Sequence, residues 1–138
     1  MPDEVVIRAV LDASAMLSYS RGHVHVGELL LDISEEGAYV GLPTVALLDA
    51  YAQTGADRLT KARLKVLATL PGVAVLSLGA ADAVEVANTV RLVKGDLARA
   101  HAVWTALDHD AYYLTSEPHL VPDVIAPELV HHIPVDDV

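Results

Sequence analysis

Short apolar stretches alternate along the chain with longer stretches in which apolar residues recur at helical spacing. The β-branched run at residues 5–11 ends at Asp12, as a buried strand does. Weaker strand patterns follow at 38–41, 73–78, 111–115 and 130–135. Helical patterns lie at 26–36, 43–53, 57–70, 80–94 and 97–107. Because short strands alternate with helices, we expect a three-layer α/β/α fold around a mostly parallel sheet.

Length and composition favour one soluble domain spanning residues 1–138. The chain is 53% hydrophobic, too apolar for a disordered protein, and has no repeat or linker. No apolar run approaches the roughly 18 residues that a membrane span needs, and the acidic start at residues 1–4 lacks the basic segment of a secretory signal. There is no cysteine, which excludes disulfides and thiolate metal sites. We therefore expect a cytoplasmic protein with no membrane partner.

The charge is strongly acidic and unevenly distributed. Nine basic residues face nineteen acidic ones, for a net charge of −10, and no Lys or Arg follows Arg99. Phosphate contacts depend on cations, so general binding to polyanions is excluded. Any nucleic acid must bind locally, at cations such as Arg21 or the helical stripe of Arg58, Lys61 and Lys65, or through a metal ion. A basic protein is the other partner that this charge suits.

Four acids stand where the ligand site of such a fold is expected, beyond the carboxyl ends of the strands. Asp12 directly follows the first strand, and Glu117 follows the fourth. Asp96 begins the helix that leads into the fourth strand. Asp49 is the only charged residue between positions 37 and 56.

Each acid also has a structural interpretation. Asp12 and Asp96 stand where helix N-caps are expected, Glu117 before Pro118 suits a solvated loop, and Asp49 suits the outer face of a helix. If the first and fourth strands are neighbours, however, the acids converge. Apart from Arg8, no Lys or Arg lies within six residues of Asp12 or Asp49. We therefore expect a carboxylate cluster that repels itself unless a divalent ion binds.

Four segments in order resemble the motifs of PIN-domain ribonucleases, over roughly residues 5–135. Residues 10–17, VLDASAML, resemble a buried strand ending in Asp-x-Ser/Thr. Residues 43–49, PTVALLD, resemble a second motif with an acid six residues after a helix-opening Pro. Residues 95–101, GDLARAH, and 111–117, AYYLTSE, resemble the third and fourth motifs.

The resemblance implies a magnesium- or manganese-dependent endoribonuclease, most often the VapC-type toxin of a toxin–antitoxin pair. Asp12, Asp49, Asp96 and Glu117 would form its catalytic acidic pocket. Asp49 stands where the family usually has Glu, and Glu117 where it usually has Asp. Magnesium prefers oxygen ligands and usually takes one or two carboxylates, and we assign Asp12 and Asp96 as its direct ligands.

Substrate contacts are expected from Ser14, Thr115 and Ser116 beside the acids, and from Arg21 as a phosphate contact. The expected partners are RNA, an antitoxin with a basic tail and a second copy of the chain in a homodimer. A haloacid-dehalogenase-like phosphatase needs a second Asp at position 14, where this chain has Ser. The main alternative is a PIN-like module that no longer cuts and serves in binding or dimerisation.

Overall fold

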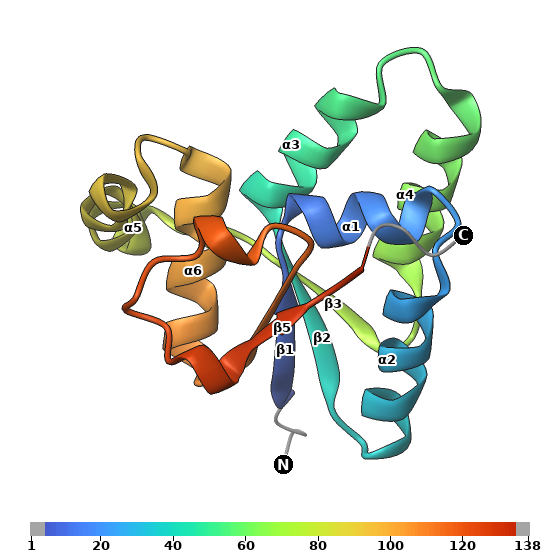
Figure 1. Ribbon diagram of the computed structural model, residues 1–138, viewed down its shortest axis with the longest axis horizontal. Helices are drawn as coiled ribbons and strands as arrows, with labels where there is room; N and C mark the ends of the chain where they lie inside the picture. The colour runs from blue at the N-terminus through green and yellow to red at the C-terminus, as the bar shows by residue number, and fades with distance from the viewer. Residues whose placement is uncertain (1–4, 135–138) are drawn as a thin grey trace.

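The computed structural model describes residues 5–134, and its centre is a five-stranded parallel sheet (Figure 1). The strands are β1 (Ile7–Leu11), β2 (Tyr39–Pro43), β3 (Val73–Leu76), β4 (Tyr112–Thr115) and β5 (Val130–His132). Their order across the sheet is β3-β2-β1-β4-β5, and every neighbouring pair is parallel. β1 thus lies at the centre, beside β4, as the sequence interpretation required.

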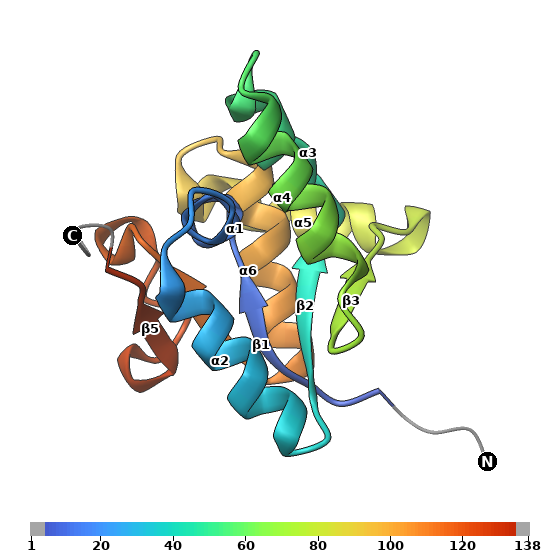
Figure 2. The same cartoon turned by 90° about the vertical axis from the view of Figure 1, so that its right-hand side faces the viewer.

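Helices cover both faces of this sheet. They are α1 (Ala13–Ser20), α2 (Val24–Glu35), α3 (Thr44–Thr54), α4 (Arg58–Thr69), α5 (Ala83–Val90) and α6 (Leu97–His109). Figure 2 shows α1 and α2 in front of β1 and α6 behind it. The predicted three-layer α/β/α fold is therefore confirmed. No helix in the described part of the chain is both long and apolar enough to span a membrane.

Several predicted boundaries are wrong. The first strand begins at Ile7, because Val5 and Val6 are half exposed and lie outside the sheet. The single helix predicted at 80–94 is instead α5 between two 3₁₀ turns, Ala80–Asp82 and Arg91–Val93. The second strand runs from Tyr39 to Pro43, two residues beyond the prediction, while the third ends early at Leu76. The fifth strand ends at His132, and residue 135 of the predicted range lies outside the described residues.

Local signals explain where three helices begin. Asp12, Asp57 and Asp96 are the N-caps of α1, α4 and α6, and each carboxylate accepts a backbone N–H of the first turn. Before α6 the chain turns through Lys94 and Gly95, both at positive φ. This turn directs the start of α6 towards the end of β4, where the acids meet.

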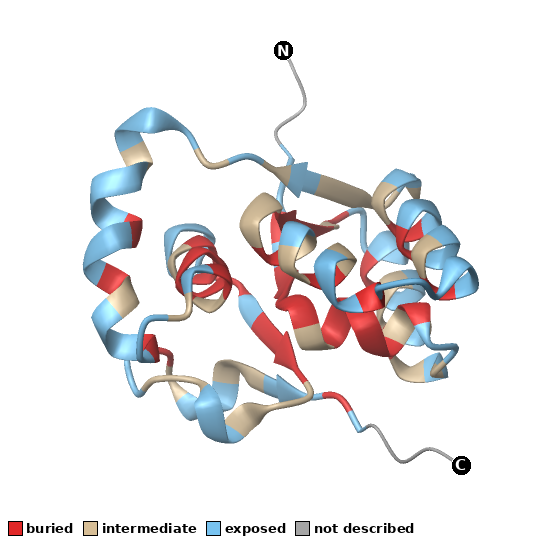
Figure 3. Cartoon of the chain, turned by 90° about the horizontal axis from the view of Figure 1, so that it is seen from above, coloured by how far each residue is buried: buried red, intermediate tan, exposed pale blue. Residues whose placement is uncertain are grey.

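The core lies between the sheet and the inner faces of the helices (Figure 3). Val10 and Leu11 of β1, Leu42 of β2 and Tyr113 of β4 are fully buried. Leu97, in contrast, is 64% exposed at the start of α6. From β1 the chain proceeds to β2 and β3 on one side of the sheet, and then to β4 and β5 on the other side. The strand order therefore reverses between β1 and β4, and ligands bind at such a reversal point in open α/β sheets.

Candidate functional site

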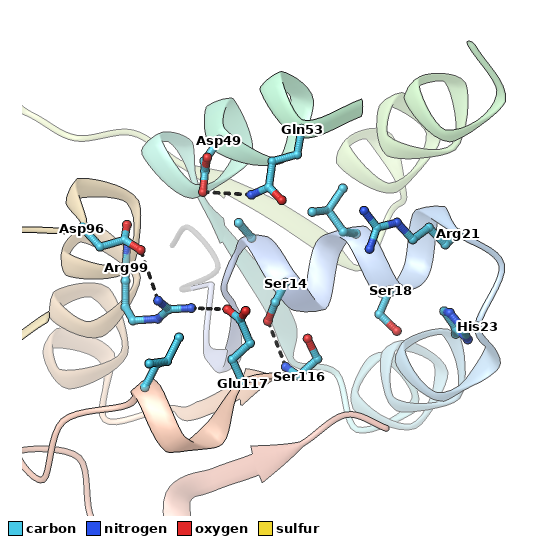
Figure 4. Close-up of a pocket in the computed structure, with 13 residues that line it drawn as sticks. Ser14, Ser18, Arg21, His23, Asp49, Gln53, Asp96, Arg99, Ser116 and Glu117 are labelled. Carbon is cyan, nitrogen blue, oxygen red and sulfur yellow. Dashed lines mark hydrogen bonds and ion pairs between the residues drawn. The ribbon is translucent and has the colours of Figure 1, made fainter. Parts of the chain in front are cut away.

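A pocket of about 510 Å³ opens at the carboxyl ends of β1 and β4, at this reversal point. Its walls come from α1, α3, the start of α6 and the segment that follows β4 (Figure 4). Asp49, Asp96 and Glu117 line it, and Asp12 lies beneath Ser14. Four segments that are far apart in the sequence thus bring all four predicted acids to one place.

Asp12 is a buried carboxylate at the floor of the pocket, 1% exposed. Its Oδ1 accepts from the Ser14 hydroxyl at 2.6 Å and from the Ala15 N–H at 3.0 Å. Its Oδ2 accepts from the Tyr113 hydroxyl at 3.1 Å. Burial raises the pKa of Asp12, and the hydrogen bonds from Ser14 and Ala15 only partly oppose the shift. Burial and the neighbouring Asp12 charge raise the pKa of Tyr113 well above its usual value, so its hydroxyl stays a donor.

Hydroxyl groups join the end of β1 to the end of β4. The Ser14 Oγ lies 3.2 Å from the Thr115 Oγ1 and accepts the Ser116 N–H at 2.9 Å. Thr115 in turn accepts the Glu117 N–H at 2.9 Å. Thr115 is fully buried, so its hydroxyl positions Glu117 from below. Ser14 and Ser116 line the pocket, whereas Thr115 lies under its wall.

The expectation of a cluster without cations is wrong, because Arg99 lies among the acids. Its Nη1 is 3.1 Å from Asp96 Oδ2, and its Nη2 is 2.5 Å from Glu117 Oε1. The same Nη2 is 3.8 Å from Asp12 Oδ2. Burial alone would lower the pKa of Arg99, but Tyr113 and these carboxylates outweigh burial and raise it. The guanidinium therefore supplies the positive charge that we had expected from a metal ion.

Asp49 occupies the opposite wall of the pocket. It projects from α3 and accepts from Gln53 Nε2 at 3.3 Å (Figure 4). Among the described residues it forms no ion pair, which distinguishes it from the other three acids. Asp49 is thus the acid whose carboxylate remains available at the pocket surface.

The far end of the pocket is basic. Arg21, the predicted phosphate contact, lies at the end of α1 and lines the pocket together with His23. Ser18, one helical turn before Arg21, also lines it. Its side chain is buried and its hydroxyl has no hydrogen-bond partner within the described chain. The pocket therefore has an acidic end at Asp96 and Glu117 and a basic end at Arg21.

A divalent metal ion does not fit the acidic end as it is arranged. No three His, Cys, Asp or Glu side chains of the described residues form a group that could hold one. Asp12, a predicted ligand, already accepts three hydrogen bonds, and Asp96, the other, pairs with Arg99. The interpretation of Asp12 and Asp96 as helix caps is confirmed at the same time, since each caps its helix.

Sequence reasoning missed Arg99 and Tyr113, and it did not predict the contact that His101 makes. Arg99 follows Asp96 by three residues, a spacing that places both on one side of a helix, and this signal was available. His101 is buried in α6, and its Nδ1 accepts the Val45 N–H at 3.3 Å, at the start of α3. Burial lowers the pKa of His101, which keeps the ring neutral and able to accept. No local pattern connects His101 to a helix 56 residues earlier.

Comparison with known proteins identifies the fold but no family. No family model matches the chain, and no curated protein matches it either. Among solved structures, PAE2754 from Pyrobaculum aerophilum is similar with a TM-score of 0.60 and 16% sequence identity. The similarity covers 95% of this chain and 85% of PAE2754. At this identity the likeness shows a shared α/β/α fold across nearly the whole chain, and it says nothing of activity.

Proposed function

We propose that this chain is a PIN-like ribonuclease that hydrolyses phosphodiester bonds of RNA at the acidic pocket, as the toxin of a toxin–antitoxin pair. The observation that carries the proposal is the convergence of all four motif acids, Asp12, Asp49, Asp96 and Glu117, at the carboxyl ends of β1 and β4. If the structure had placed these four acids on separate surfaces of the molecule, the proposal would have had no basis. The proposed partners are RNA and an antitoxin whose basic tail complements the net charge of −10.

The two ends of the pocket suit different parts of an RNA strand. Arg21 is exposed at the basic end and is our candidate for contact with a phosphate of the substrate. Asp49 is our candidate for the general base that accepts the proton of an attacking water, because its carboxylate faces the pocket and no cation in residues 5–134 pairs with it. The proposed dependence on Mg²⁺ or Mn²⁺ comes from the family resemblance, and the present position of Arg99 stands against it.

A second candidate function is a PIN-like module that binds RNA or a protein without cutting. The observation that favours it is the pairing of Arg99 with Asp96 and Glu117, since the described residues then offer no group of side chains that could hold a metal ion. The two candidates differ in a measurable way, because only the ribonuclease turns RNA over.

The test is cleavage of a single-stranded RNA labelled with a fluorophore and a quencher, in Mg²⁺, Mn²⁺ or EDTA. The ribonuclease proposal predicts cleavage in a divalent metal that EDTA abolishes. Asp49→Asn is the matched control, since it removes one charge from a half-exposed side chain and should abolish cleavage without unfolding the protein. Equal cleavage by both proteins would reveal a contaminant and overturn the proposal. RNA that binds, measured by fluorescence anisotropy, but stays intact would support the second candidate.

A further inference from the structure

The guanidinium of Arg99 lies between carboxylates from three separate segments. Asp12 ends β1, Asp96 caps α6 and Glu117 follows β4, and the guanidinium is within 4 Å of an oxygen of each. Arg99 itself belongs to the first turn of α6, one turn beyond Asp96. Its position is therefore set by the same helix start that brings Asp96 to the pocket.

The contacts of Arg99 differ from those of an ordinary surface ion pair. The Arg99 side chain is only 11% exposed, while Asp96 and Glu117 are 40% and 45% exposed. Surface pairs contribute little because water screens them, but a guanidinium largely removed from water depends on its paired charges. The buried Nε of Arg99 has no hydrogen-bond partner among the described residues. The charge of the guanidinium is therefore neutralised by the carboxylates that contact Nη1 and Nη2.

These contacts use the oxygens that a metal ion would need. Asp96 Oδ1 accepts the Arg99 N–H as a helix cap, and its Oδ2 pairs with Nη1. Glu117 Oε1 pairs with Nη2. A divalent ion held by these same oxygens would lie within a few ångströms of a fixed positive charge, where Coulomb repulsion is large and poorly screened.

We infer that Arg99 is the built-in counter-cation of this pocket and keeps its affinity for divalent metal ions low. The inference rests on the proposed function, since it concerns the metal that the proposed ribonuclease would use. Loss of the Arg99 charge leaves Asp96 and Glu117 unpaired beside the buried Asp12, and three unneutralised carboxylates attract a divalent cation. The affinity of this pocket for a divalent metal ion is thus set by one side chain.

The test compares Mn²⁺ binding to the full-length protein and three variants by isothermal titration calorimetry. Arg99→Gln removes the charge and keeps a hydrogen-bonding side chain, and it should bind Mn²⁺ about tenfold or more tightly than the unmodified protein. Arg99→Lys keeps the charge, and its Mn²⁺ binding should remain as weak as that of the unmodified protein. Arg91→Gln is the matched control, because it makes the same change in net charge at an exposed site away from the pocket. Its Mn²⁺ binding should also remain weak.

Melting temperatures in EDTA establish that each variant is folded. If Arg99→Gln is unfolded, Arg99→Met replaces it, because Met keeps an apolar stem of similar length. Tight Mn²⁺ binding by the unmodified protein overturns the inference whatever the variants do, and metal-dependent RNA cleavage would then still support the ribonuclease. Binding no tighter in Arg99→Gln or Arg99→Met than in Arg91→Gln also overturns it. If Arg99→Gln gains Mn²⁺ affinity but neither it nor the unmodified protein cuts RNA, the counter-cation role stands and the ribonuclease proposal fails.

Discussion

At the scale of single residues, Asp12 combines two roles that compete for one carboxylate. It caps α1 through the Ala15 N–H, and it closes the floor of the pocket through Ser14 and Tyr113. Burial disfavours its charge, and the contacts recover only part of that cost, which is why its pKa is raised. The same burial removes Asp12 from direct contact with solvent in the pocket.

The raised pKa of Asp12 predicts a particular dependence of stability on pH. The native state binds the proton more tightly than the unfolded state, whose pKa is near 3.8, so the charged carboxylate costs stability above the folded-state pKa. This cost is relieved as the pH falls through the folded-state pKa towards 3.8. Asp12→Asn should therefore be more stable relative to the unmodified protein at pH 7 than at pH 4.

Urea denaturation of both proteins at pH 7 and pH 4 checks this prediction. Asn caps a helix about as well as Asp, so the two proteins should differ by less than about 1 kcal/mol at pH 4. A stability gain from Asp12→Asn that is equal at both pH values would contradict the raised pKa of Asp12. A gain that is larger at pH 4 than at pH 7 would show that the Asp12 charge is favourable in the folded protein.

At the scale of helices and strands, the amphipathic pattern predicted the elements better than their ends. α4 is the clearest case, since Asp57 caps it and its buried positions Leu64 and Leu67 recur at helical spacing. The stretch at 80–94 was less predictable, because its apolar residues are compatible with a single helix as well as with α5 flanked by 3₁₀ turns. Tertiary packing decides between these, and it is not encoded in the local period.

α4 allows a direct test of core packing with a matched control in the same helix. Leu67 is completely buried, and the adjacent Val66 is 51% exposed. Leu67→Ala should reduce the free energy of unfolding by about 2–5 kcal/mol, because it leaves a cavity against α1 and the sheet. Val66→Ala should change it by less than about 0.5 kcal/mol. Chemical denaturation measures both, and equal losses would mean that α4 does not pack on the core as described.

At the scale of the whole molecule, we predict a homodimer, as the family resemblance implies. Leu48 of α3 and Leu97 of α6 are 67% and 64% exposed, on two helices that pack against each other. Burial of these side chains against a second copy would remove apolar surface from water. Light scattering at micromolar concentration should give twice the chain mass of 14.6 kDa. A mass of one chain, unchanged in Leu48→Glu and Leu97→Glu, would contradict the prediction.

The residue pattern alone was sufficient for the order of most of the elements, the layered α/β/α class and the four acids of the pocket. These features depend on neighbours close in the sequence or on the general rule that parallel strands end at one edge of the sheet. The charge balance of the pocket depended on the tertiary structure. Glu117 is 18 residues from Arg99 and Asp12 is 87 residues from it, yet one guanidinium meets both. Coulomb interactions and desolvation depend on distance and burial in space and not on separation along the chain. The sequence therefore predicted a carboxylate cluster without a neutralising charge, whereas the folded pocket contains its own cation, Arg99.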